Sequence, residues 1–121
     1  MSTQPPNPST INDQTVPKLD ELHHVAIQVQ DISRAVSWYC DKFRCEVSWQ
    51  DETWALLRFA NTSLAFVLPG AHPPHLAFSM EEADQLGPLQ PHRDDTRSLY
   101  INDSEGNVIE CIDPLSLSSS L

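Results

Sequence analysis

The sequence predicts an α+β domain in which two related modules share one mixed sheet. Each module has the order strand, helix and three strands, and the second module is shortened. Two observations lead to this prediction. Residues 24–68 carry strand and helix periodicities in that order. A second stretch, beginning at His75, repeats the pattern of the first. The length of 121 residues is that of a single domain.

The first module begins with a strand that is expected over residues 24–29. Val25 and every second residue after it are apolar, whereas His24 faces the opposite side of the sheet. Asp31 is placed to cap the helix that follows. The apolar stripe of that helix consists of Ile32, Ala35, Val36, Tyr39 and Phe43. Three short strands are expected next, at about residues 46–50, 53–59 and 63–68.

The second module repeats the first at two places. The stretches "HHVAIQVQD" and "PHLAFSMEE" share a histidine, an aliphatic residue, an alanine and a large apolar residue in that order. The stretch "WALLRFANTSLAF" aligns without a gap on "SLYINDSEGNVIEC" when Trp54 is set against Leu99. The offset is 51 residues between His24 and His75 (75 − 24) but 45 between the hairpins (99 − 54). The second module therefore lacks about six residues, which we expect its helix and the next strand to have lost.

Polar segments flank the two modules. Residues 1–18 are rich in Pro, Ser, Thr, Asn and Gln, and we expect a disordered tail because this segment cannot bury enough apolar surface. The folded domain is expected over residues 19–114. Within it the first module covers about residues 22–70 and the second about residues 74–114. Residues 115–121 form a second, shorter tail.

The charge of the chain restricts its partners. It has 17 acidic and 7 basic residues, which gives a formal net charge of −10. This balance argues against binding to nucleic acid or to anionic membranes, and it disfavours strongly anionic substrates unless a metal supplies positive charge. No apolar run approaches the roughly 20 residues of a membrane span. Three cysteines without a CxxC motif indicate reduced thiols and a cytoplasmic location. A small molecule is the expected partner.

Three stretches carry a resemblance that covers nearly the whole predicted domain. They are "LHHVAIQVQDISRAVSWYCDKF", "PHLAFSM" and "RSLYINDSEGNVIECID". In them the chain resembles the vicinal oxygen chelate superfamily, which includes glyoxalase I, bleomycin-resistance proteins, fosfomycin-resistance transferases and extradiol dioxygenases. The resemblance implies paired modules in a curled mixed sheet that forms a cup around a divalent metal. The ligands that it implies are His24, His75 and Glu110.

The residue pattern supports this ligand set. His24 and His75 occupy equivalent places in the repeat, so both should point toward the same central cavity. Ile109 and Cys111 share the strand face opposite Glu110, which then faces the cavity if the apolar face packs on helices. Two imidazoles and one carboxylate suit Fe(II), and Mn, Ni and Zn also accept such a set. The alternative is that these residues are hydrogen-bonded or solvated polar groups at strand ends.

Among the activities of the superfamily, the extradiol dioxygenases fit best. Glyoxalase I enzymes generally use a carboxylate from each module, but Ala65 stands at the position that repeats Glu110. His92 and Tyr100 have dioxygenase-like spacing to Glu110, although Ser104 replaces the proline of that pattern. The resemblance implies that His92 accepts or returns a proton and that Tyr100 hydrogen-bonds and orients the substrate. The alternatives are a polar loop for His92 and packing in the sheet for Tyr100.

Several other residues invite simpler interpretations. His23 is expected on the opposite face from its neighbour, as a surface or capping histidine, and His72 belongs to a Pro-rich loop. Three tryptophans could line a pocket, but packing in the core or at the edge is favoured: Trp38, Trp49 and Trp54. Cys111 is expected to be a buried small apolar residue.

These observations leave three classes of function. The first is a metal-dependent enzyme acting on vicinal oxygens of a small substrate, with an Fe(II) extradiol-type dioxygenase preferred over a glyoxalase-like lyase or isomerase. The second is a metal-free binding protein like the bleomycin-resistance proteins, which generally lack the His-His-Glu set. The third is a scaffold with a relict site, left open by the shortened second module. A homodimer is expected because a small sheet leaves exposed edges and because family members of this length usually dimerise.

Overall fold

A computed structural model describes residues 18–92 and 95–117 of the chain. The predicted N-terminal tail therefore lies outside the described residues except for Lys18. At the other end a short helix, α2 (Pro114–Leu117), occupies the start of the predicted C-terminal tail, and residues 118–121 are not described. Within the described part, no helix has the length and apolar character needed to cross a membrane.

The element order follows the predicted repeat. The first module contains β1 (Glu21–Gln28), α1 (Ile32–Lys42), β2 (Glu46–Gln50), β3 (Trp54–Arg58) and β4 (Ser63–Val67). The second contains β5 (His75–Ser79), the 3-10 helix η2 (Ala83–Leu86), β6 (Gln90–Pro91), β7 (Arg97–Asn102) and β8 (Val108–Ile112). The helix of four residues and the strand of two residues are the shortened elements. No element of the module is lost, so the sheet continues to the far edge.

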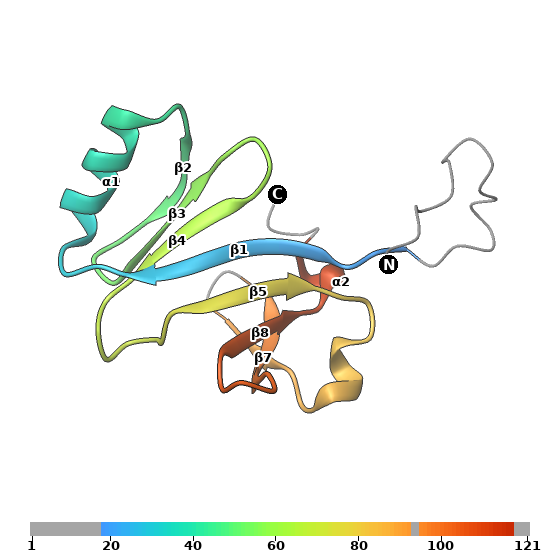
Figure 1. Cartoon of the computed structure of the whole chain (residues 1–121). Coiled ribbons are helices and arrows are strands. Elements are labelled where there is room, and N and C mark those ends of the chain that lie inside the picture. Colours follow the sequence, from blue (N-terminus) through green and yellow to red (C-terminus); the bar gives the residue numbers. More distant parts are fainter. Residues whose placement is uncertain (1–17, 93–94, 118–121) are drawn as a thin grey trace, which may run out of the picture.

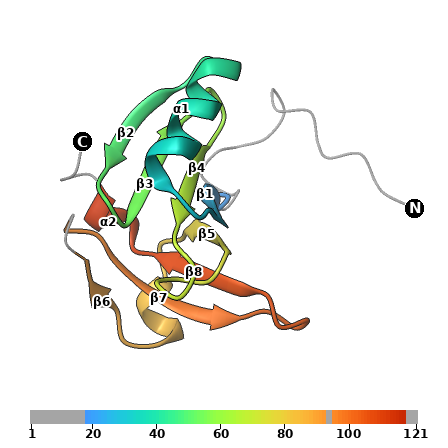
Figure 2. The same cartoon turned by 90° about the vertical axis from the view of Figure 1, so that its left-hand side faces the viewer.

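All these strands form one 8-stranded sheet in the order β2-β3-β4-β1-β5-β8-β7-β6. The first strands of the two modules lie side by side at its centre, where β1 pairs antiparallel with β5 (Figure 1). Each first strand also pairs in parallel with the last strand of its own module, β1 with β4 and β5 with β8. The sheet curls, as two views at right angles show (Figures 1 and 2). The predicted fold of two modules in a curled mixed sheet is confirmed.

Helix α1 covers the convex face of the first module (Figure 2). Its first turn is capped as expected, because Asp31 Oδ1 accepts a hydrogen bond from the Arg34 backbone N–H at 2.9 Å. The buried residues of this core come from α1, β3 and β4: Ile32, Val36, Ala55, Leu57 and Phe66. Because side chains alternate along a strand, the neighbouring residues of β3 and β4 face the concave side.

A second, smaller core lies under η2. Ala83 packs there with Leu99 of β7 and Cys111 of β8, which is 3% exposed as the sequence predicted for a small apolar residue. Ile109 joins the same cluster. Since Ile109 and Cys111 face this core, Glu110 between them faces the concave side.

The gapless alignment of the two hairpins is wrong by one residue. In the second hairpin Tyr100 pairs with Glu110, whereas in the first Leu56 pairs with Ala65. Residues 59–62 connect β3 to β4, but residues 103–107 connect β7 to β8, so the second turn is one residue longer. Gly106 in this turn has φ of 88°, a conformation that glycine adopts readily. Tyr100 is therefore equivalent to Leu56, and Ala65 remains equivalent to Glu110, as predicted.

Candidate metal centre

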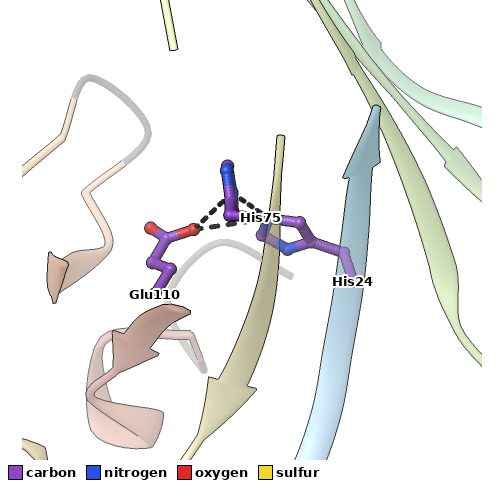
Figure 3. A group of neighbouring side chains, drawn as sticks. All are labelled: His24, His75 and Glu110. Atoms are coloured by element: carbon purple, nitrogen blue, oxygen red, sulfur yellow. Dashed lines mark hydrogen bonds and ion pairs between the residues drawn. The ribbon is translucent and has the colours of Figure 1, made fainter. Parts of the chain in front are cut away.

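The three strands at the centre of the sheet position His24, His75 and Glu110. His24 lies on β1, His75 on β5 and Glu110 on β8, and the three side chains point toward one another on the concave side (Figure 3). In the sheet register, Ala77 stands between His24 and Glu110 on the intervening strand. Its small, fully buried side chain lets the two longer side chains approach each other above it.

The donor atoms of these side chains form a nearly equilateral triangle. His24 Nε2 and His75 Nε2 are 3.3 Å apart, and Glu110 Oε1 lies 3.4 Å from the first and 3.2 Å from the second. Bonds of about 2.1 Å to one metal would separate neighbouring donors by about 3.0 Å at right angles and by about 3.4 Å at tetrahedral angles. The spacing fits either geometry. The cluster could therefore hold a divalent metal, with one carboxylate and two imidazoles on the same side of it.

Each candidate ligand has a second polar atom that is held by a neighbour. His75 Nδ1 donates to the Pro73 carbonyl oxygen at 2.9 Å, which leaves Nε2 unprotonated in the neutral ring. Glu110 Oε2 accepts a hydrogen bond of 2.6 Å from Ser98. The Nδ1 atoms of His24 and His23 are 2.8 Å apart, so one ring donates and the other accepts. These contacts orient the remaining donor atoms toward a common point.

The expected position of His23 on the opposite face is wrong. The pairing of β1 with β5 shifts between Leu22 and His24, which marks a β-bulge at His23. The bulge interrupts the alternation of faces, so both histidines of the pair line the same cavity. His23 is thus a neighbour of the candidate ligand His24. An alternation argument cannot anticipate a bulge, which depends on the pairing partner.

Ser98 also belongs to the site, although the sequence does not predict it. Ser98 is 1% exposed, and its hydroxyl oxygen lies 2.6 Å from both Glu110 Oε2 and His92 Nε2. Because the carboxylate can only accept, the hydroxyl donates to Glu110 and accepts from His92. The available signal was that Ser98 lies two residues before Tyr100, on the same face of β7.

Burial and hydrogen bonding oppose each other in the titration of the cluster. Burial raises the pKa of Glu110, but hydrogen bonds from His24, His75 and Ser98 outweigh it and bring the pKa well below its ordinary value. Burial lowers the pKa of His75, but hydrogen bonds with Glu110 and with the Pro73 carbonyl reverse this and raise the pKa above its ordinary value. The raised pKa of His75 and the lowered pKa of Glu110 both favour an ion pair between the two side chains.

A cavity of about 390 Å³ opens in front of the cluster, a volume typical of small-molecule sites. Both residues expected to be catalytic line it. The side chain of His92 is 31% exposed, and its Nε2 atom lies 3.7 Å from Glu110 Oε2. The ring of Tyr100 meets the ring of His75 edge-on, with centroids 5.3 Å apart. Burial and the charge of Glu110 raise the pKa of Tyr100, so its hydroxyl stays protonated and can donate a hydrogen bond.

Other aromatic residues also belong to the cavity. His72 is exposed in its loop, as expected, but its ring stacks on Tyr100 with centroids 6.4 Å apart and lines the cavity. Trp49 and Trp54 line the cavity as well, although packing in the core or at the edge was favoured for them. Trp38 lies exposed on α1.

The family assignment follows from a match to a protein-family model. The model of the Glyoxalase/Bleomycin resistance protein/Dioxygenase superfamily matches residues 21–92, which is more than half of the chain. The chain belongs to this superfamily. The match covers β1 to β6 and so includes His24, His75 and His92, whereas Glu110 lies beyond it. No curated protein matches the chain.

Solved structures share the fold at low identity. Methylmalonyl-CoA epimerase from Mycobacterium tuberculosis is 19% identical, with a TM-score of 0.60 over 76% of this chain and 86% of that one. A superfamily member from Vibrio splendidus 12B01 is 10% identical, with a TM-score of 0.60 over 78% and 98%. The E323L mutant of homoprotocatechuate 2,3-dioxygenase from Brevibacterium fuscum is 21% identical, with a TM-score of 0.56 over 76% and 32%. This chain thus spans about a third of that dioxygenase, and the likenesses show the fold alone.

Proposed function

We propose that the protein is a divalent-metal-dependent enzyme that acts on a small substrate through two neighbouring oxygen atoms. One observation carries the proposal: the donor atoms of His24, His75 and Glu110 are 3.2–3.4 Å apart, and all three residues line one cavity. A divalent metal held by these residues would supply Lewis acidity and open coordination positions for two substrate oxygens.

The reaction that we favour is an Fe(II)-dependent, extradiol-type dioxygenation of a catechol-like molecule. Two cavity residues support it. The protonated Tyr100 hydroxyl can hydrogen-bond and orient a substrate oxygen, and the His92 imidazole can accept or return a proton. Ser98 holds the His92 ring beside Glu110, which keeps the proton-transfer group next to the chelating end of the cavity.

A second candidate is a glyoxalase-like lyase or isomerase. Its support is the epimerase among the structures that share the fold. Ala65, at the position equivalent to Glu110, removes the fourth ligand that glyoxalase I enzymes generally use. A binding protein of the bleomycin-resistance kind is the third candidate, and the His-His-Glu cluster counts against it.

Metal reconstitution tests the proposal. Protein loaded anaerobically with Fe(II) should take up oxygen with a catechol, and Glu110→Ala should lower metal content strongly while the circular dichroism spectrum stays unchanged. Glu105→Ala, which removes an exposed glutamate from the β7–β8 turn, is the matched control and should bind metal normally. Unchanged metal content in Glu110→Ala would overturn the metal site.

Turnover of a hemithioacetal by Ni(II) or Zn(II) protein, without oxygen uptake, would select the lyase. Absence of both reactions, together with tight binding of another ligand, would select the binding protein.

A homodimer completes the proposal. Strand β2 forms one edge of the sheet, and all five of its residues are exposed. Unpaired edges are a liability that association with a second copy covers. All three candidate ligands come from one chain, so in this proposal each subunit keeps its own site.

A further inference from the structure

The part of the cavity wall that the two hairpins form is apolar in the first module and polar in the second. The hairpin registers make three pairs of positions equivalent: Ser98 with Trp54, Tyr100 with Leu56, and Glu110 with Ala65. In each pair the residue of the second module is polar and that of the first is apolar, and five of these six residues line the cavity directly. The hairpin of the second module therefore presents groups that bind oxygen atoms, next to His24 of β1, and the hairpin of the first module presents a surface that binds hydrocarbon.

The apolar wall is aromatic and is held in place. The rings of Trp49 and Trp54 stack with centroids 5.9 Å apart and an angle of 24° between their planes. The register of β2 shifts between Val47 and Trp49, so a bulge turns Trp49 to the concave side. Its indole Nε1 donates to Asp51 Oδ2 at 3.2 Å, which fixes the ring beside Trp54. At 45% exposure Trp49 contributes little to the core, and its ring is available to a ligand.

None of the described residues that line the cavity is a lysine or an arginine. The two arginines on the strands beside it are already paired, Arg58 with Glu46 and Arg97 with Asp113. Along the stacked rings of Trp49 and Trp54, a carboxylate or phosphate on the substrate would lose its hydration without gaining a charged partner. The charge of −10 on the chain adds to this exclusion.

We propose that the ligand has two unlike ends. One end carries the neighbouring oxygen donors and lies at His24, His75 and Glu110. The other is an uncharged apolar body, aromatic or alkyl, that lies along Trp49 and Trp54. The inference rests on the proposed function for the chelating end and adds the chemical class of the remainder.

Calorimetric titrations of the Zn(II)-loaded protein with three related ligands measure how much each end of the ligand contributes to affinity. These titrations do not depend on turnover. Catechol reports the chelating end alone. The ligands 4-ethylcatechol and 3,4-dihydroxyphenylacetate have side chains of similar size, the first apolar and the second anionic. We expect 4-ethylcatechol to bind about tenfold more tightly than catechol, because two further carbons leave water. The carboxylate should bind more weakly than catechol. Arg93 lies outside the described residues, so the structure does not say whether it reaches the cavity. The comparison of the two substituted catechols tests the exclusion of anions without that knowledge.

Tryptophan variants locate the apolar end. Trp54→Ala and Trp49→Ala should each lower the gain from the ethyl group, measured as the ratio of the dissociation constants of catechol and 4-ethylcatechol in the same variant. Trp49→Ala, at an exposed edge, keeps the test available if Trp54→Ala does not fold. The control is Trp38→Ala, which removes an exposed tryptophan from α1, outside the cavity lining, and should change neither affinity.

The outcomes distinguish the two proposals. If catechol does not bind to the Zn(II) protein, or binds equally to Glu110→Ala, the proposed function fails and the inference fails with it. If catechol binds but the ethyl group adds no affinity, or the carboxylate binds as tightly as 4-ethylcatechol, the inference alone is overturned.

Discussion

The buried hydroxyl of Ser98 donates a hydrogen bond of 2.6 Å to Glu110 Oε2, the carboxylate oxygen that faces away from the two histidines. This bond fixes the carboxylate so that Oε1 faces His24 and His75. Partners of this kind typically contribute a factor of 10 to 100 in metal affinity.

Ser98→Ala should therefore lower the affinity for Zn(II) by about tenfold, measured by competition with a chelator. The absorption bands of the Co(II)-substituted variant should also shift, because the carboxylate is no longer fixed. Ser37→Ala, at an exposed site on α1, serves as the control and should leave both readouts unchanged. Wild-type affinity and spectrum in Ser98→Ala would contradict an orienting role for Ser98.

His23 should act on the metal through His24. When His24 Nε2 binds a metal, its Nδ1 carries the proton and donates it to His23 Nδ1, 2.8 Å away. His23→Phe removes this acceptor and should weaken Zn(II) binding by roughly tenfold. His72→Phe alters another cavity histidine, one that touches Tyr100 and none of the three candidate ligands, and should keep affinity within about twofold. Equal losses in both variants would indicate a general effect on the cavity.

Metal binding should stabilise the fold. Zn(II) at 100 times its dissociation constant should add about 2.7 kcal/mol to the free energy of unfolding, since the unfolded chain lacks the assembled site. For a domain of this size, that corresponds to a rise in Tm on the order of 10 °C, measured by calorimetry with and without a chelator. Glu110→Ala should show little or no rise. A similar rise in that variant would place the bound metal elsewhere.

The stability contributed by Asp51 should depend on pH. Hydrogen bonds from the backbone and hydroxyl of Thr53, from the Trp54 backbone and from the Trp49 indole lower the pKa of Asp51 to about 2. A lowered pKa means that the folded state favours the ionised form, so the contribution is complete above the unfolded pKa near 4 and is lost as the pH falls toward 2. Asp51→Ala should thus destabilise the protein by about 1 kcal/mol at pH 7 in urea unfolding, less than the pKa shift alone implies because solvent screens this carboxylate.

The difference between the wild type and Asp51→Ala should shrink below pH 4. Asp41→Ala, at an exposed site on α1, should show no comparable loss at pH 7. A difference that stays constant from pH 7 to pH 3 would mean that Asp51 acts through its shape and not through its charge.

The quaternary prediction is a homodimer. Light scattering at micromolar concentration should give a mass of about 27 kDa, twice the 13.6 kDa of the chain. Val47→Glu, which places a charge on the exposed edge strand β2, should shift the population toward the monomer if that edge forms the interface. A wild-type mass of one chain would refute the dimer.

The sequence predicts most of the fold because the two periodicities are clear. Ile27 and Val29 of the alternating stretch, and the stripe from Ile32 to Tyr39, pack in the core beside α1 as the spacing predicts. The equivalence of His24 and His75 in the repeat also anticipates that the two rings meet. These features depend on local spacing, which a single sequence carries in full.

The features that the sequence does not predict depend on pairing between strands. Bulges turn His23 and Trp49 toward the cavity, and neither bulge has a local signature in the chain. The longer turn before β8 makes Ser98 equivalent to Trp54, one position away from the gapless alignment. Ser98 joins the site only because β7 places it beside Glu110 and His92.

The antiparallel pair of β1 and β5 is the junction between the modules, and the candidate ligands lie on both sides of it. The first module supplies His24, and the second supplies His75 and Glu110, so neither module alone contains the complete set. A metal bound by all three would act as a crosslink between the halves of the domain, and its binding free energy would be lost when they separate. The loaded protein would then unfold as one cooperative unit, whereas the empty protein would resist separation of its halves only through strand pairing and side-chain packing.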